Sequence, residues 1–256
     1  MTTISQISTN GAVENAGAAV RSMFEGRGPD IWLAGDPEDL KDLLPLGPRG
    51  IVTNTVVLND MVKKYGQITE VVQRYLDITD KQVVVEIDGH TTQELLDVGE
   101  VFTKMSDQVV LKIPTTMHGL GAFRALSAAG VETFCTTVFT LTQAAAVAQS
   151  GATHILPFCE PYRDVSGDPT KLVRECKAML GDWAQRPYIT AALARSVDTA
   201  YRALRDGADG VIVFWPVYQG MMQSMLTDQW NQTFLDNWNE MYDAGLMVDV
   251  PVVRSH

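Results

Sequence analysis

Short runs of β-branched and apolar residues alternate along the chain with longer stretches whose apolar residues recur at helical spacing. We predict eight strands, at Ile31–Ala34, Gly50–Thr53, Gln82–Asp88, Val109–Pro114, Glu132–Val138, His154–Phe158, Tyr188–Ala192 and Gly210–Phe214. The stretches between them predict helices at Asn59–Leu76, Thr92–Met105, Gly119–Ala129, Thr142–Gln149, Asp168–Leu180 and Val197–Arg205. This regular alternation is typical of βα units around a parallel sheet.

Eight such units predict an α/β fold, and the leading architecture is a single (β/α)8 TIM barrel, whose usual size the 256 residues match. A doubly wound open sheet is the alternative, because the number of strands does not by itself close a barrel. We further predict an N-terminal helical extension with a helix near residues 12–24, and C-terminal helices over residues 218–226 and 227–243. No linker or shift of composition divides the chain, so residues 1–256 are expected to form one domain.

Composition narrows the classes of function. The net charge is -11 without a stripe of lysine and arginine, which argues against nucleic acid as a partner. No apolar run approaches the roughly 18 residues that span a bilayer, and the N-terminus lacks a secretory signal pattern, so we expect a cytoplasmic protein without a membrane partner. The cysteines and histidines show no metal-binding spacing, and the glycine motifs for nucleotides do not occur. We therefore expect neither a metal nor a cofactor.

One charged residue, Lys112, lies within the apolar fourth strand, which reads VVLKIPTT. Barrel active sites lie at the carboxyl ends of the strands, and a lysine that faces the interior there would have its pKa lowered by burial, which favours the nucleophilic amine. The third strand, QVVVEIDG, presents Glu86 and Asp88 on one face, where a carboxylate moves protons directly or through a water. The alternatives are a lysine that extends to solvent, and an internal ion pair with Glu86 that takes no part in catalysis.

Other polar residues follow the ends of the predicted strands. Thr136 or Thr137 in the fifth strand, FCTTV, has a hydroxyl suited to holding a water. Asn54 after the second strand is suited to binding a ligand oxygen, although turn formation explains such a residue equally simply. Arg163 and Arg195 follow the sixth and seventh strands, and each guanidinium suits a phosphate or carboxylate, with surface salt bridges as the alternative.

The block VVLKIPTTMHGLGAFRALSAAGVETFCTTVFTLTQAAAVAQSGATHILPF resembles the transaldolase family, including its fructose-6-phosphate aldolase branch. The pair Thr53–Asn54 and the segment Glu86–Asp88 extend the similarity, which covers about residues 31–214. The resemblance implies class I aldolase chemistry without metal or cofactor. It also implies the transfer of a dihydroxyacetone unit between sugar phosphates, as in the pentose phosphate pathway.

The resemblance assigns roles residue by residue. Lys112 matches the Schiff-base lysine, Glu86 the carboxylate that works through a water, and Thr136 the threonine that helps to hold that water. Asn54 matches the asparagine that binds a substrate hydroxyl, and its neighbour in the TN pair is a further substrate-binding candidate. Phe158 stands where transaldolases carry Phe and the aldolase branch carries Tyr, and Glu86 stands where that branch carries Gln. Both positions favour the transaldolase side.

Two positions depart from the family pattern. Members usually carry Asp at the end of the first strand, where this chain reads IWLAGDP and has Ala34 or the glycine after it; Asp36 would replace the missing carboxylate if the strand continues. The Ser-x-Arg pattern that grips the substrate phosphate after the seventh strand is here Leu193 and Arg195. Arg163 in CEPYRDVSGDP would still reach a phosphate, and Leu193 would equally suit a more apolar substrate.

Three interpretations follow. The first is a transaldolase-like Schiff-base enzyme that acts on a ketose or its phosphate. The second is a diverged aldolase that uses the same lysine imine on an unusual acceptor in a specialised biosynthetic pathway. The third is a non-catalytic barrel that binds a sugar or a partner protein. The first two take a small sugar or sugar phosphate as partner, and the C-terminal helices are compatible with a homo-oligomer as well as with a monomer.

Overall fold

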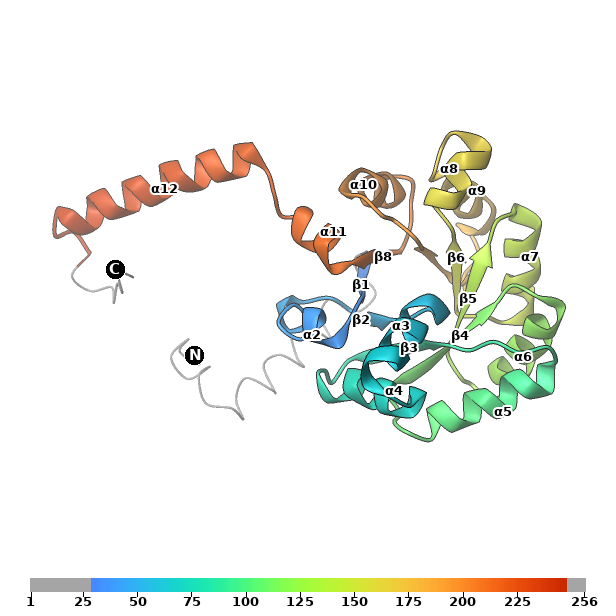
Figure 1. Cartoon of the computed structure of the whole chain (residues 1–256). Coiled ribbons are helices and arrows are strands. Elements are labelled where there is room, and N and C mark those ends of the chain that lie inside the picture. The colour runs from blue at the N-terminus through green and yellow to red at the C-terminus, as the bar shows by residue number, and fades with distance from the viewer. Residues whose placement is uncertain (1–28, 248–256) are drawn as a thin grey trace. The chain divides into compact units, whose positions relative to one another are not determined.

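The computed structural model describes residues 29–247, which divide into two compact units, one that ends at Trp215 and one that begins at Pro216. The first unit is a ring of strands surrounded by helices, and the second carries the last long helix (Figure 1). The predicted helix near residues 12–24 lies outside the described residues. A single domain over residues 1–256 stays a prediction.

Eight parallel strands form a closed barrel in which each strand pairs with its neighbours in chain order and β1 pairs with β8. The strands are β1 (Asp30–Ala34), β2 (Gly50–Val52), β3 (Gln82–Glu86), β4 (Val109–Pro114), β5 (Thr133–Val138), β6 (His154–Pro157), β7 (Tyr188–Ala191) and β8 (Gly210–Phe214). The predicted (β/α)8 barrel and its eight strands are therefore confirmed. The open doubly wound sheet is wrong, because an open sheet has no hydrogen-bonded ladder between its first and last strands.

Helices follow the strands and cover the outside of the barrel (Figure 1). They are α2 (Pro37–Leu40), α3 (Thr55–Tyr65), α4 (Ile68–Asp77), α5 (Thr92–Thr103), α6 (Met117–Ala128), α7 (Leu141–Ser150), α8 (Glu160–Ser166), α9 (Lys171–Leu180) and α10 (Val197–Arg205), with a 3-10 turn η2 at Leu44–Leu46. Polar side chains cap several of them: the hydroxyl of Thr91 accepts the backbone N–H of Glu94, and that of Thr140 accepts the N–H of Gln143.

The helices differ from the prediction in two respects. The single helix expected over residues 59–76 is two helices, because Gly66 adopts a φ of 107° and Gln67 then forms a capping box with Glu70. The bounds of the short helices α2 and α8 were not predicted, because segments of 4 and 7 residues hold too few turns to display a helical period.

Side chains from alternate strand positions fill the inside of the barrel. The interior cluster consists of Trp32, Ala34, Val52, Val84, Val110, Phe134, Leu156, Ala192 and Ile212. At the amino-terminal end of the strands, His154 stacks between Phe134 and Tyr188, with ring centroids 3.9 and 4.9 Å apart. This aromatic layer fills the amino-terminal end of the barrel. The carboxyl ends of the strands are therefore the face at which a ligand approaches the interior.

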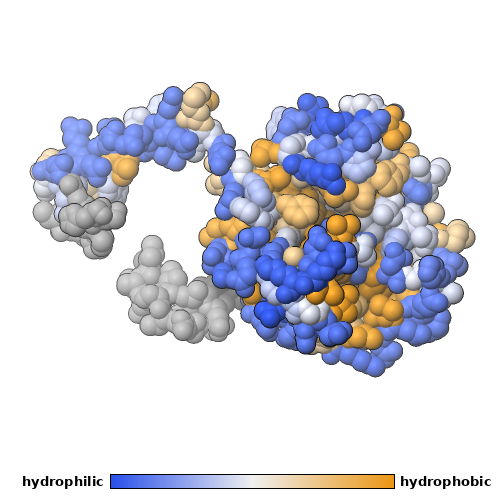
Figure 2. Space-filling view, in the orientation of Figure 1, coloured by the Kyte–Doolittle hydropathy of each residue, from blue (hydrophilic) through white to orange (hydrophobic). Residues whose placement is uncertain are grey.

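The second unit contains α12 (Met225–Asp243), and α11 (Trp215–Gly220) begins at the last residue of the barrel unit. The predicted C-terminal helices are confirmed with shifted bounds, and Ser224 caps the long helix by accepting the N–H of Thr227. The visible face of α12 is largely hydrophilic in Figure 2, and Trp230 and Phe234 are exposed apolar side chains on this helix. Between residues 29 and 247, no helix combines the length and apolar character needed to cross a membrane.

We predict that Leu156→Ala lowers the free energy of unfolding by about 2–5 kcal/mol, because it opens a cavity in the barrel interior where Leu156 is fully buried. Leu46→Ala is the matched control, since Leu46 is 68% exposed and the same truncation there changes stability by less than about 0.5 kcal/mol. Denaturant unfolding of both variants measures the difference. Equal losses of stability in the two variants would contradict the assignment of the core.

Candidate active site

Lys112 lies inside the barrel, on the face of β4 that also carries Val110. Its side chain is 6% exposed, and its Nζ is 2.8 Å from Oε2 of Glu86. The two residues face each other in the parallel ladder between β3 and β4, so the strand register itself brings the amine and the carboxylate together. Lys112 is therefore not a lysine that extends to solvent; it forms the internal ion pair.

Burial of Lys112 acts in the direction that favours a nucleophile. Removal from water lowers the pKa of its ammonium group, and this outweighs Glu86, whose charge and hydrogen bond raise the pKa. The ammonium group of Lys112 therefore loses its proton at a smaller free-energy cost than that of a lysine at the surface. The neutral amine is also the form that attacks a carbonyl carbon.

Thr53 fixes the end of β3 from the neighbouring strand. Its hydroxyl donates to the carbonyl oxygen of Val84 at 3.0 Å and accepts the backbone N–H of Glu86 at 3.1 Å. The residue is 1% exposed, so its hydroxyl is used inside the sheet. The hydroxyl of Thr53, a predicted substrate-binding residue, therefore bonds the backbone on either side of Val85 and holds the end of β3.

Thr136 lies on β5, beside the strand that carries Lys112, and it pairs with Pro114 in the ladder. The side chain is fully buried, and its hydroxyl has no hydrogen-bond partner among the described residues. A buried hydroxyl without a partner costs free energy unless a water or a ligand atom satisfies it. Thr136 is thus suited to holding a polar atom close to β4, the strand that carries Lys112.

A bulge in β5 follows Thr136. The ladder with β6 shifts between Cys135 and Val138, and Thr137 adopts a φ of 60°, which residues with a side chain rarely do. Thr115 holds the bulge from the end of β4: its N–H donates to Oγ1 of Thr137 at 3.2 Å, and its hydroxyl donates to the carbonyl oxygen of Thr136 at 2.6 Å. Strained backbone of this kind is concentrated at functional sites.

Asn54 and Phe158 stand at the ends of β2 and β6. Asn54 caps α3 by accepting the N–H of Val57 at 2.8 Å, which uses its side-chain oxygen and leaves its amide NH2 as a donor. Phe158 packs against the interior cluster and contacts Phe139, with 5.3 Å between ring centroids. One residue therefore offers a hydrogen-bond donor at the carboxyl face of the barrel, and the other an apolar surface.

Asp36 lies in the turn after β1, where three donors share its carboxylate. Nζ of Lys64 is 2.6 Å away, the hydroxyl of Tyr65 is 2.7 Å away, and the backbone N–H of Glu38 is 3.0 Å away at the start of α2. Burial raises the pKa of Asp36, but these hydrogen bonds outweigh it and lower the pKa overall. A carboxylate held in this way is a weakened base.

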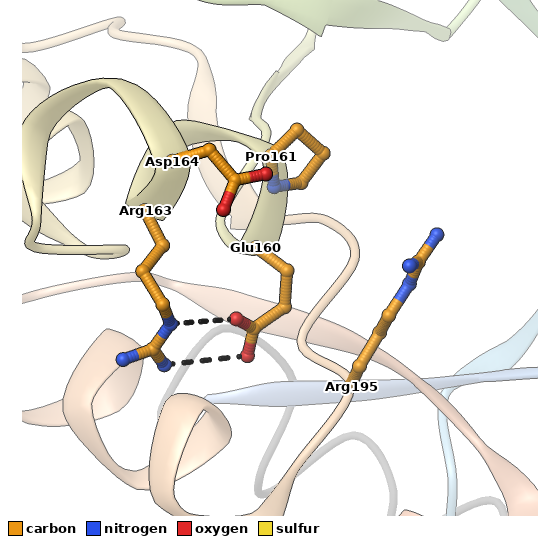
Figure 3. Close-up of a pocket in the computed structure, with 5 residues that line it drawn as sticks. All are labelled: Glu160, Pro161, Arg163, Asp164 and Arg195. Atoms are coloured by element: carbon orange, nitrogen blue, oxygen red, sulfur yellow. Dashed lines mark hydrogen bonds and ion pairs between the residues drawn. The ribbon is translucent and has the colours of Figure 1, made fainter.

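Arg163 and Arg195 come together in one open pocket of about 390 Å³, which Glu160, Pro161 and Asp164 also line (Figure 3). Nε of Arg163 is 2.8 Å from Oε2 of Glu160, so this arginine is already paired. Glu160 was not among the predicted site residues, although the segment CEP shows an acidic residue shortly after the sixth strand. Thr115 was not predicted either, because its contacts depend on a bulge that has no sequence signature.

A buried lysine beside a carboxylate, at the carboxyl face of a (β/α)8 barrel, is an arrangement suited to carbonyl chemistry by an enzyme amine. Comparison with known proteins agrees with this class. The model of the transaldolase/fructose-6-phosphate aldolase family matches residues 54–207, a range that contains Glu86, Lys112 and Thr136.

Individual relatives extend the similarity along the chain. A probable transaldolase from Thermoplasma volcanium is 28% identical over 211 residues, covering 82% of this chain and 95% of the relative. A probable transaldolase from Coprothermobacter proteolyticus is 31% identical over 193 residues, covering 75% of this chain and 87% of the relative. Among solved structures, a provisionally named phosphonomutase from Burkholderia cenocepacia J2315 has a TM-score of 0.53 and 14% identity, covering 81% of this chain and 95% of its own, which shows the fold alone.

The chain belongs to the transaldolase/fructose-6-phosphate aldolase family. It is accordingly an enzyme of the transaldolase or aldolase type, and the resemblance inferred from the lysine strand is confirmed at the level of the family. The interpretation as a non-catalytic barrel loses its support.

We predict that Glu86→Gln lowers the pKa of Lys112 further, because burial persists while the charge that opposes it is lost. Glu100→Gln is the control, since Glu100 lies on α5 and pairs with the exposed Lys104 at the end of that helix, so we expect the pKa of Lys112 to stay unchanged. The measurement is an NMR titration of the lysine side chains labelled with carbon-13. A pKa of Lys112 that stays constant or rises in Glu86→Gln would mean that the ion pair does not control this amine.

Proposed function

We propose that the protein makes and breaks a carbon–carbon bond of a ketose through a Schiff base on Lys112, transferring a dihydroxyacetone-type unit. The observation that carries the proposal is the buried contact of 2.8 Å between Nζ of Lys112 and Glu86. It joins an amine whose pKa is lowered by burial to a carboxylate able to move protons, at the face where barrel enzymes bind their substrates.

The proposed chemistry proceeds through covalent intermediates on Lys112. The neutral amine of Lys112 attacks the ketone carbon, and the resulting carbinolamine loses its hydroxyl as water to give the imine. The protonated imine then accepts the electron pair of the breaking carbon–carbon bond. The hydroxyl on the other carbon of that bond passes its proton to Glu86, and the fragment that carries this hydroxyl leaves as an aldehyde. The enamine that remains attacks a second aldehyde, and hydrolysis of the new imine releases the ketose product and regenerates the amine.

Glu86 and Thr136 are proposed to handle the protons of imine formation. Glu86 is within hydrogen-bond distance of the amine, and the unpartnered hydroxyl of Thr136 is suited to holding the water through which the carboxylate acts. Asn54 is proposed to donate its amide N–H to a substrate hydroxyl, and Phe158 to form an apolar wall beside the bound chain.

We assign Asp36 to anchoring the turn after β1 rather than to proton transfer, because its lowered pKa and its three donors weaken it as a base. Glu86 is then the carboxylate that serves the cleavage step as well as imine formation. The absence of a carboxylate on Ala34 at the end of β1 favours, as a second candidate, a diverged aldolase that uses the same imine on an unusual acceptor.

The substrate side of the proposal is a ketose or ketose phosphate, with carbohydrate metabolism through the pentose phosphate pathway as the setting. Three cysteines, Cys135, Cys159 and Cys176, are free and buried, which suits the reducing conditions of the cytoplasm. Catalysis by Lys112 and Glu86 requires neither a metal nor an organic cofactor for the imine route.

We predict that borohydride added with fructose 6-phosphate, fructose or dihydroxyacetone attaches a reduced three-carbon or six-carbon unit to the peptide that contains Lys112. Lys112→Met abolishes this adduct and lowers turnover by more than about a thousandfold, because no other group replaces the nucleophile. Lys104→Met is the matched control, since Lys104 is an exposed lysine on the surface and its loss leaves the adduct unchanged.

Mass spectrometry of the digested protein locates the adduct. No adduct with any of the three ketoses, or an adduct on a different lysine, would refute the proposal.

We predict that Thr136→Val lowers turnover by about tenfold, because the variant removes the hydroxyl that is proposed to hold the water used by Glu86. Thr190→Val is the control for stability: its buried hydroxyl is 3.0 Å from Nδ1 of His154, so its removal costs stability without removing a group of the proposed mechanism. Steady-state kinetics and denaturant unfolding of both variants give the readouts, and unchanged turnover in Thr136→Val would remove this residue from the mechanism.

A further inference from the structure

The pocket after β6 and β7 carries four charged side chains of both signs. Glu160, Arg163 and Asp164 come from α8, and Arg195 comes from the turn that follows β7 (Figure 3). Two acidic and two basic groups leave the lining of the pocket without a net positive charge. A binding site for a phosphate dianion needs a net positive charge and an excess of hydrogen-bond donors.

Glu160 forms an ion pair with Arg163, the arginine that a phosphate in this pocket would need to bind. Its two carboxylate oxygens are 2.8 Å from Nε and 3.5 Å from Nη2 of Arg163, a forked ion pair that uses the face of the guanidinium suited to an anion. Figure 3 marks interactions between these two residues, while the guanidinium of Arg195 extends away from them. The Arg163 hydrogen bond also lowers the pKa of Glu160, so the carboxylate is ionised at neutral pH.

Thr199 of α10 also holds Glu160 in place. The side chain of Thr199 is fully buried. The hydroxyl of Thr199 donates to Oε1 of Glu160 and accepts Nη2 of Arg163 at 3.1 Å. Ser196 caps α10 by accepting the N–H of Thr199 at 3.1 Å, and its own hydroxyl oxygen is 3.0 Å from that of Thr199. The side chain of Glu160 is 18% exposed, so it is a fixed part of the pocket wall rather than a mobile surface group.

The backbone also presents Glu160 to the carboxyl face of the barrel. Phe158, which packs on the interior cluster, precedes it by two residues and forms a bridge with Ala192. The N–H of Glu160 donates to the carbonyl oxygen of Leu193 at 3.4 Å, and Leu193 adopts a φ of 54° that is unusual for a residue with a side chain. The pocket is therefore built by the ends of two adjacent strands on the face that holds Lys112.

The geometry points to Glu160 as a specificity-determining residue, which turns this pocket away from phosphate and toward the uncharged, hydroxyl-bearing end of an unphosphorylated ketose. The inference rests on the proposed function for the identity of the ligand as a ketose. It goes beyond that function by choosing between the free sugar and its phosphate.

A phosphate group and a sugar hydroxyl would interact differently with Glu160 in this pocket. A phosphate would have to displace the carboxylate from Arg163 or lie beside it, and either outcome places like charges together at a few ångströms. A sugar hydroxyl donates to the carboxylate of Glu160 and accepts from the guanidinium of Arg195, and neither contact requires the ion pair to break. A fixed carboxylate among the donors thus discriminates by repulsion against one ligand as well as by attraction to the other.

The first experiment measures the affinity for inorganic phosphate by calorimetry in the full-length protein and in three variants. Glu160→Gln keeps the shape and the acceptor for Thr199 but frees Arg163, so we expect phosphate to bind about tenfold tighter than in the unsubstituted protein. Asp164→Asn removes an equal charge from the same pocket without freeing Arg163, and we expect a change of less than about twofold. Glu160→Gln combined with Arg163→Gln loses the gain.

Equal phosphate affinity in the unsubstituted protein and in Glu160→Gln overturns the inference, and so does an equal gain in Asp164→Asn. Thermal unfolding of each variant verifies that the barrel is intact. Phosphate binding needs no imine, so this result stands apart from the outcome at Lys112.

The second experiment compares borohydride trapping rates for fructose and fructose 6-phosphate at equal concentrations. We expect the unsubstituted protein to form the adduct at least as fast with fructose as with its phosphate, and Glu160→Gln to shift the ratio of the two rates about tenfold toward the phosphate. A strong preference of the unsubstituted protein for fructose 6-phosphate overturns the inference while supporting the imine. Failure of both ketoses to trap refutes the imine instead, and phosphate affinity then decides the role of Glu160 alone.

Discussion

The contact between Lys112 and Glu86 is the interaction on which the proposed chemistry depends. Neither charge would be stable in the barrel interior without the other, because the loss of water around each is costly. The pair exists because β3 and β4 are adjacent in register and both residues point inward. Closure of the barrel by the ladder between β1 and β8 keeps that register, since the closed ring leaves no edge strand from which pairing could slip.

The surroundings of this pair are built from residues that mostly support rather than touch a substrate. Thr53 holds the backbone of Glu86 from β2, and Thr115 holds the bulge that follows Thr136. The bulge accounts for the positive φ at Thr137. In this way three neighbouring strands after β2 deliver a base, an amine and a hydroxyl to the same end of the barrel. The strained backbone at this point is consistent with a structure that is held in place for function.

The eight strands, including β4 with Lys112, could be predicted from the sequence, because they follow from local patterns of apolar residues. The sequence also indicated the family, since VVLKIPTT and the block after it were sufficient for the resemblance. It could not predict the break at Gly66, because an isolated glycine inside a helical pattern is tolerated and does not by itself mark the end of a helix. The contact of Asp36 with Lys64 and that of Arg163 with Thr199 were equally out of reach, since these partners approach only through the tertiary fold.

Imine formation between Lys112 and a ketone removes the ketone oxygen as water. It is therefore measured by the exchange of the carbonyl oxygen of dihydroxyacetone with water labelled with oxygen-18, followed by mass spectrometry. We expect the protein to accelerate this exchange above the uncatalysed rate, and the acceleration to depend on the amine of Lys112. Exchange at the uncatalysed rate with the intact protein, under conditions in which it turns over a ketose, would mean that no imine forms on Lys112.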